Sequence, residues 1–202
     1  MNTRFLTTVW LLIMSTLPLS GCISLFPESG PLPSQISLEP SVEKSKFASK
    51  VVLQVLEPTA PLNLMGTKIA IKKVNEAGLT VYTTAQGQEW TQALPKLFER
   101  LMVDHFRSPS WPGVISASQS IPANYQLELD IRRFNIVLNQ GVEVEINAVL
   151  FNTSSNKIEA SQTFAYTENS PHSFRAYVDT LNRLTGQFLR DIGTFLESHM
   201  KN

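Results

Sequence analysis

From Tyr125 to Leu150, apolar and polar residues alternate, and this pattern constrains the fold more than any other feature. The stretch "YQLELDI" from Tyr125 is typical of a strand with one buried and one wet face. The alternation slips by one residue at Arg132 and Arg133, as a β-bulge would cause. It resumes in "VEVEINAVL" after the turn signal "NQG", and "IEASQTFAYT" follows a second turn signal, "TSSNK". The sequence therefore predicts an antiparallel meander of three strands.

Shorter patterns before the meander predict three strands and a helix. The strands are expected over residues 51–56, 67–74 and 79–83. The helix is expected over residues 90–106, because large apolar residues recur there at steps of three and four. Pro95 lies inside this pattern, so the regular helix either starts just before it or bends there.

The C-terminal part of the chain predicts a second and stronger helix. Ser170 is a candidate cap with Pro171 at the first helical position, and an apolar stripe runs from Phe174 to Leu196. An apolar stripe of this length needs a sheet to cover. The expected fold is therefore α+β: a two-layer sandwich of a mainly antiparallel sheet with two amphipathic helices on one face.

The N-terminus has the order of an export signal. Residues 1–4 carry a positive charge, residues 5–14 are almost all apolar, and small residues become frequent over residues 15–21. A membrane-spanning helix needs about 20 apolar residues. Because Ser15, Thr16 and Pro18 interrupt the apolar run, a cleaved signal peptide is a better interpretation than a permanent transmembrane anchor.

The only cysteine, Cys22, directly follows this signal. Leu19, Ser20, Gly21 and Cys22 resemble the bacterial lipobox, in which the cysteine receives a diacylglycerol and becomes the first residue of the mature chain. The alternative is that Cys22 is a small buried core residue. Several acyl chains together hold a protein on a bilayer effectively permanently. Ile23, rather than Asp, follows the cysteine, which favours the outer membrane and its periplasmic face in a Gram-negative bacterium.

Three segments are expected along the chain: a signal peptide over residues 1–21, lipidated Cys22 with a proline-rich tether over 22–50, and a folded domain over 51–202. A partly stiff tether of this length could lift the domain several tens of ångströms off the bilayer. It could also be a tail with no spacing role.

Composition argues against several classes of function. Seventeen basic and seventeen acidic residues leave no net charge that would attract nucleic acid. One cysteine and three scattered histidines do not have the spacing of a zinc site, and no serine lies in a nucleophile motif. We therefore expect no cofactor, no metal and no catalytic residue.

Several segments together carry a family resemblance: the lipobox, the tether, "WTQALPKLFERLMVDHF" from Trp90, "YQLELDIRRFNI" from Tyr125, "VEVEINAVLFN" from Val142 and the last helix. The chain resembles the ABC-type transport auxiliary lipoproteins, which include Pqi-type outer-membrane lipoproteins. The resemblance implies docking to a periplasmic MCE-domain protein and its inner-membrane permease system, which move phospholipid or other hydrophobic molecules, and allows a homo-oligomer.

Four apolar residues are candidates for partner binding. Leu62, Leu64 and Met65 lie in the turn-rich loop "PLNLMG", where they could cap the core or form an exposed patch. Trp111 could seal the end of the sheet or anchor an interface. The charged residues of the meander could form a polar docking surface or only an ordinary wet face of the sheet.

Three hypotheses follow from this sequence. The chain could be a tethered adaptor, a carrier that holds acyl chains in a cavity between sheet and helices, or a structural envelope lipoprotein. A carrier needs an apolar cavity of several hundred cubic ångströms. Large residues such as Phe98 and Phe188 favour a filled interior instead.

Overall fold

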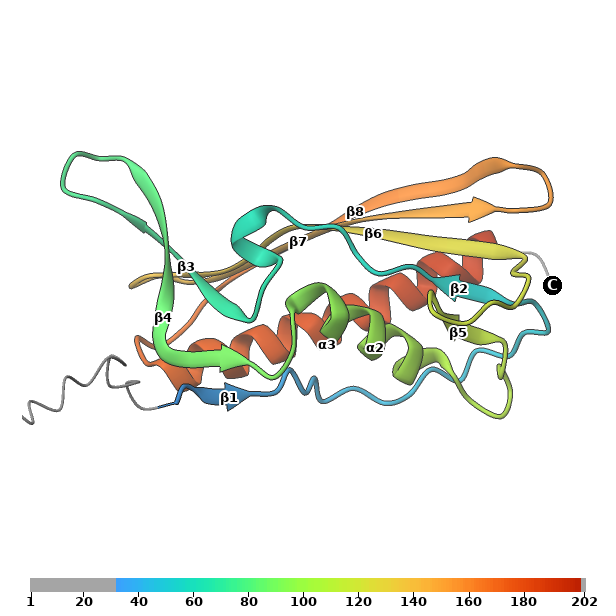
Figure 1. Ribbon diagram of the computed structural model, residues 1–202, viewed down its shortest axis with the longest axis horizontal. Helices are drawn as coiled ribbons and strands as arrows, with labels where there is room; N and C mark the ends of the chain where they lie inside the picture. Colours follow the sequence, from blue (N-terminus) through green and yellow to red (C-terminus); the bar gives the residue numbers. More distant parts are fainter. Residues whose placement is uncertain (1–31, 201–202) are drawn as a thin grey trace, which may run out of the picture. The chain divides into compact units, whose positions relative to one another are not determined.

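The computed structural model describes residues 32–200, of which those from Pro33 onward form one compact unit. The predicted signal peptide, the predicted lipobox residues Leu19, Ser20 and Gly21, and Cys22 lie outside the described residues. Eight strands, two α-helices and one short 3-10 helix are described (Figure 1). In chain order they are β1 (Ser34–Ile36), β2 (Leu53–Val55), η1 (Leu62–Leu64), β3 (Lys68–Val74), β4 (Thr80–Trp90), α2 (Leu94–Phe106), β5 (Val114–Ser116), β6 (Tyr125–Val137), β7 (Gly141–Asn152), β8 (Lys157–Asn169) and α3 (Phe174–His199).

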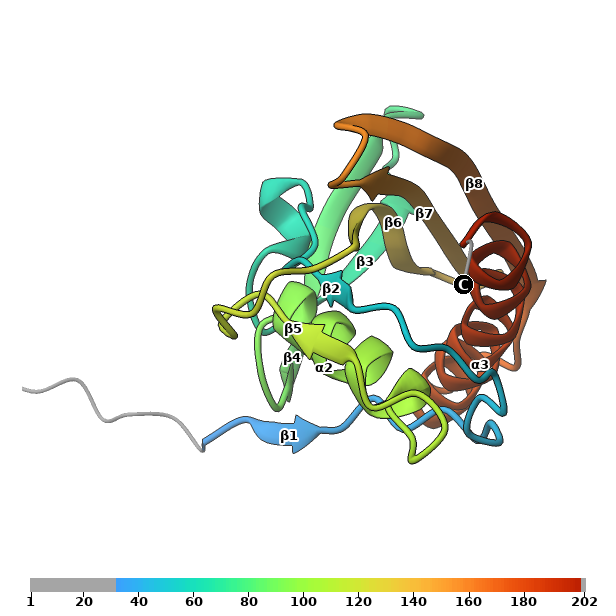
Figure 2. The same ribbon diagram turned by 90° about the vertical axis from the view of Figure 1, so that its right-hand side faces the viewer.

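The fold is α+β, as the sequence predicts: a mainly antiparallel sheet is covered on one face by α2 and α3 (Figures 1 and 2). β6 is the central strand. Its N-terminal part pairs in parallel with β2 and its C-terminal part pairs in parallel with β3, so two short strands share one edge. The other edge pairs along its length with β7. β4 continues the sheet beyond β3, and β1 pairs with the end of β4.

The three-strand meander predicted from the alternation is confirmed as β6, β7 and β8. The expected bulge is also present, because the β6–β7 register shifts between Ile131 and Arg133. Asn139 has a φ of 61° in the first hairpin turn, and Asn156 has a φ of 53° in the second. Asparagine tolerates this left-handed conformation better than most residues do.

The boundary between β4 and the first helix differs from the prediction. The first helix begins at Leu94, with Pro95 in its first turn, whereas Trp90 is the last residue of β4 and only 2% exposed. β4 continues past Thr83 because Gly87, with a φ of 69°, lets the strand bend toward β1.

The second helix starts three residues later than expected. Ser173, not Ser170, caps α3, and its hydroxyl accepts a hydrogen bond from the N–H of Ala176 at 3.2 Å. Ser170 is instead buried and accepts a hydrogen bond from the hydroxyl of Thr180 at 3.2 Å. The proline at position 171 therefore lies in the connection that precedes α3.

Aromatic rings fill the space between the sheet and the helices. Phe134 of β6 meets Phe98 of α2 edge to face, with ring centroids 5.3 Å apart. Phe98 in turn contacts Phe188 of α3 at 6.1 Å, and Phe188 contacts Phe164 of β8 at 5.4 Å. This chain of rings joins all the main layers, and each pair adds about 0.5–1.5 kcal/mol beyond burial alone.

The compact unit begins at Pro33, so the predicted domain boundary at residue 50 falls inside it. Residues 34–50, which we call the strap, begin with β1 at the edge of the sheet and then run along the helices on the side away from the long strands β6–β8 (Figure 2). Leu38 is 4% exposed, and the ring of Phe47 packs on Trp111. The part of the expected tether that the structure describes is therefore bound to the domain. The apolar residues of the strap follow neither a helix nor a strand period. For this reason the sequence of the strap, with its prolines and serines, resembles a linker.

Candidate docking surface

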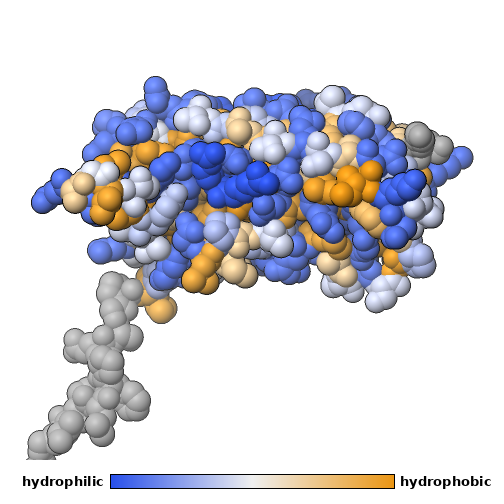
Figure 3. All heavy atoms as spheres, turned by 90° about the horizontal axis from the view of Figure 1, so that it is seen from above, coloured by the Kyte–Doolittle hydropathy of each residue, from blue (hydrophilic) through white to orange (hydrophobic). Residues whose placement is uncertain are grey.

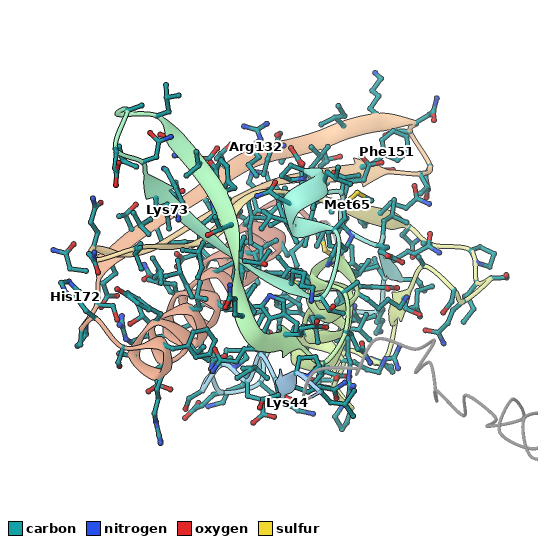
Figure 4. The ribbon with its side chains drawn as sticks, turned by 60° about the vertical axis from the view of Figure 1, so that its left-hand side comes forward. Lys44, Met65, Lys73, Arg132, Phe151 and His172 are labelled. Atoms are coloured by element: carbon teal, nitrogen blue, oxygen red, sulfur yellow. The ribbon has the colours of Figure 1, made fainter. Side chains whose placement is uncertain are left out.

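Charged side chains from three strands meet on the sheet face opposite the helices. Arg133 on β6 forms an ion pair with Glu145 on β7 and lies 3.9 Å from Glu143. Arg132 pairs with Asp130 at 3.1 Å, and Figure 4 shows it on the outer side of the sheet. The bulge allows this, because it leaves two successive arginines exposed on β6.

Glu143 is the most buried member of this charged network. Its carboxylate lies 3.0 Å from the ammonium of Lys72 on β3 and accepts a hydrogen bond from Nδ2 of Asn135 at 3.1 Å. Asn135 is 1% exposed, and its Oδ1 accepts no hydrogen bond from the described residues. Because the charges are paired with one another, this network stabilises the cross-strand register and leaves little unbalanced charge for a partner.

The loop predicted as a partner site forms η1. Its three apolar side chains point in different directions, two toward solvent and one into the core. Leu62 is 89% exposed and Met65 is 55% exposed, whereas Leu64 is 1% exposed and belongs to the core. Figure 4 shows Met65 on the outside of η1. Two of the three predicted loop residues thus form a small exposed apolar patch, held in place by the third.

Trp111, the fourth candidate, lies in the core at 0% exposure. Its indole Nε1 donates a hydrogen bond to the carbonyl of Val51 at 2.9 Å, and its ring contacts Phe47 and Phe106. Trp111 was expected either to seal the end of the sheet or to anchor an interface. Its burial fits the first of these roles. It is not at the surface with Leu62 and Met65.

The histidines do not form a catalytic group with one another. His105 is buried in the last turn of α2 rather than at the surface, and burial, followed by the nearby charge of Lys44, lowers its pKa. His172 is exposed in the connection before α3, and His199 lies in the last turn of α3. Within residues 32–200, no group of three or more His, Cys, Asp or Glu side chains could hold a metal ion.

The strap and the two helices border a surface groove of about 380 Å³. Its lining mixes apolar side chains such as Leu38 with Lys44, Arg100 and Asp104. A cavity for acyl chains would be enclosed and mostly apolar. The groove lacks this character, and the interior of the sandwich is occupied by the aromatic rings described above.

Sequence reasoning did not identify other exposed apolar residues on the two long hairpins. Val74, Leu79 and Tyr82 belong to the β3–β4 hairpin and are 65%, 62% and 49% exposed, and Ile158 at the start of β8 is 64% exposed. Figure 3 shows apolar groups among polar ones on the face seen from above. Strand alternation alone cannot reveal such residues, because it does not show how far a hairpin extends past the helices.

None of the helices in residues 32–200 is both long and apolar enough to span a membrane. A family model described as the ABC-type transport auxiliary lipoprotein component matches residues 35–193. This match includes nearly all of the strap as well as the sheet and most of α3.

Two solved structures share the fold. A DUF330 protein from Xanthomonas campestris is 20% identical with a TM-score of 0.66, over 83% of this chain and 100% of that one. An uncharacterized protein is 16% identical with a TM-score of 0.60, over 78% of this chain and 99% of that one. No curated protein matches the chain significantly. At these identities, the likeness to the two structures establishes the fold alone.

Proposed function

The chain belongs to the ABC-type transport auxiliary lipoprotein family, and from this premise we propose that it docks an MCE-type lipid transport system at the outer membrane. The match across residues 35–193 carries the proposal, because it covers the whole described fold except its two ends. In this role the domain binds and positions its partners and does not catalyse. The transported molecules would be phospholipids or other hydrophobic compounds.

The proposed anchor is a lipid on Cys22, which would hold the domain at the periplasmic face. Because the strap belongs to the body, the free chain would run only from Cys22 to Ser34, twelve residue steps. A fully extended chain covers at most about 3.6 Å per residue, so the domain would stay within about 40 Å of its anchor. This reach is shorter than the one expected for a tether that ends at Lys50.

We assign the partner contact to Leu62 and Met65. Both side chains are exposed, both are apolar, and the buried side chain of Leu64 fixes the short helix that presents them. An interface needs a few apolar anchors on a rigid support, and methionine adapts well to a partner surface. The charged network is less suitable, because its groups already pair with one another.

The packing of the interior favours the adaptor over the carrier. Edge-to-face contacts link Phe134, Phe98, Phe188 and Phe164 through the middle of the sandwich. An acyl chain could enter only if these rings moved apart, which would cost the burial and ring contacts of several residues. A structural envelope role does not require the interior to open. That role is distinguished from the adaptor by whether the chain binds a specific partner.

The test is photo-crosslinking in cells. A photoreactive amino acid replaces Leu62 in one full-length variant and Ile121, 49% exposed, in a matched control. We expect a covalent adduct with an MCE-domain protein from position 62 and at most a weak one from position 121. Adducts only with a second copy of the chain, or none at either position, would contradict docking and favour the structural role.

A further inference from the structure

The β3–β4 hairpin ends in a well-defined turn that presents apolar side chains to solvent. The carboxamide Oδ1 of Asn75 accepts hydrogen bonds from the N–H groups of Ala77 at 3.1 Å and Leu79 at 2.9 Å. Gly78, with a φ of 76°, completes the turn, and its N–H donates to the carbonyl of Asn75 at 2.9 Å. Leu79 is therefore held outward by a hydrogen-bonded turn.

Other apolar residues lie beside this turn. Val74 and Tyr82 share one face of the hairpin, because Val74 is paired with Thr80 and Tyr82 with Lys72. Leu138, 42% exposed, donates its N–H to the carbonyl of Lys72 at 2.9 Å. By its register, Leu138 is in step with Lys73 and lies on the other face of the sheet from Val74 and Tyr82. We call the set Val74, Leu79 and Tyr82 the apolar tip. Single exposed apolar residues are ordinary, but a group at one end of a domain marks a contact surface.

Tyr82 of the apolar tip lies on β4, the strand that also pairs with the start of the described chain. Ser34, the first residue of β1, pairs with Gln88 of β4, and Thr80 begins that strand beside the turn. Eight residue steps of strand correspond to roughly 26 Å. Figure 1 shows the hairpin turn and the beginning of β1 toward the same end of the domain.

One exposed lysine at this end can reach the headgroups of a bilayer. Lys73 is exposed and has no ion-pair partner among residues 32–200, and Figure 4 shows it on the hairpin, on the same side as His172. Glu76 in the turn offsets this charge. A lysine beside apolar residues can extend to lipid phosphates while its methylenes stay in the apolar layer, and tyrosine is favoured at this boundary.

We infer that the apolar tip rests in the interfacial layer of the bilayer to which the chain is anchored. This inference depends on the proposed lipid at Cys22, because an anchor within about 40 Å of Ser34 brings the tip within reach of the same bilayer. The tip then acts as a second contact that fixes the orientation of the domain. The opposite end, where the β7–β8 turn lies, is left facing the periplasm (Figure 1).

The experiment uses the full-length chain, processed and lipidated in cells. Cys22 is its only cysteine, so after lipidation a new cysteine is the sole reactive thiol. Leu79→Cys places a polarity-sensitive fluorophore at the tip, and Ile158→Cys places it on a similarly exposed residue of the β7–β8 hairpin. Both proteins are reconstituted into vesicles of phosphatidylethanolamine and phosphatidylglycerol with spin-labelled lipids.

We expect emission at shorter wavelength and strong quenching from position 79, and water-like, unquenched emission from position 158. Vesicle flotation is measured on the same samples. If the protein floats and the two positions give the same emission and quenching, the inference is overturned while the lipid anchor stands. If the wild-type protein does not float, the anchor is rejected, and the inference that depends on it is rejected as well.

Discussion

The ring of Phe47 packs edge-on against the indole of Trp111, with 4.9 Å between the ring centroids. This contact fastens the strap to the turn that follows α2. The backbone N–H of Ser49 supports it by donating to the carbonyl of Ser110 at 3.2 Å. The strap is therefore part of the core around Trp111, which is fully buried beneath it.

Phe47→Ala should lower the free energy of unfolding by about 1–2 kcal/mol, which is below the value for a fully buried phenylalanine because the ring is only half-buried. Urea titration measures this change. Leu62→Ala, at an exposed position, should stay within about 0.5 kcal/mol of wild type. Equal effects of the two substitutions would mean that the strap does not contribute to stability.

Gly141→Ala should be strongly destabilising, because a Cβ at this position would overlap the carbonyl oxygen of Glu168 on β8. The two strands would have to separate, at a cost of about 1–3 kcal/mol or more. The matched control is Gly66→Ala, where the nearest atom to the new Cβ is 4.0 Å away. Thermal unfolding should show a clear decrease for the first variant only. Similar melting temperatures would contradict the close approach of β7 and β8.

Glu143→Gln should lower stability by about 1–3 kcal/mol, because it removes a charge from a mostly buried carboxyl that pairs with Lys72. Asp104→Asn removes a charge of the same sign from an exposed pair with Arg100 on α2. That loss should be about 0.5 kcal/mol or less and should vanish at high salt. Chemical denaturation at low and high salt distinguishes the two cases. A larger effect at Asp104 would contradict the burial described for Glu143.

The pKa of His105 is lowered in the folded state, first by burial and then by the charge of Lys44. As the pH falls, His105 in the unfolded chain therefore takes up a proton near pH 6.5, whereas in the folded protein it does so only at lower pH. This contribution to stability is complete above about pH 6.5 and is lost as the pH falls from there toward the folded pKa.

Replacing His105 with Gln should therefore make stability less dependent on pH between about 7.5 and 5.5 than in wild type. Urea titrations at several pH values give the slope. His172→Gln, which replaces an exposed histidine, is the matched control for the loss of an imidazole. If His105→Gln keeps the wild-type slope, the proposed effect of burial on His105 is wrong.

The parts of the fold that follow a regular period could be predicted from the sequence. Strict alternation located β6 and β7, and the slip at Arg132 correctly indicated the bulge. The C-terminal stripe located α3. Residues 34–50 could not be placed, because Leu38 and Phe47 are buried by contacts with distant segments and not by a local pattern.

The candidate site was predictable only in part, for a geometric reason. In a 3-10 helix, successive side chains point about 120° apart, so a short run of apolar residues must divide between core and solvent. The sequence identifies the loop but does not show that Leu64 is the buried member and Leu62 the exposed one. Trp111 was ambiguous because its partner Phe47 lies in the segment predicted as tether.

The N–H of Glu39 in the strap donates to the side-chain Oδ1 of Asn182 in α3 at 2.7 Å, across a separation of 143 residues. Contacts between residues this far apart in sequence form late in folding and lower the folding rate. The contact of Glu39 therefore forms only once α3 has folded, whereas the contact of Phe47 with Trp111 needs only the turn after α2. With the proposed lipid on Cys22, this order means that the half of the strap nearer the anchor becomes fixed to the domain last, so the distance between domain and bilayer is set only when the C-terminal helix is in place.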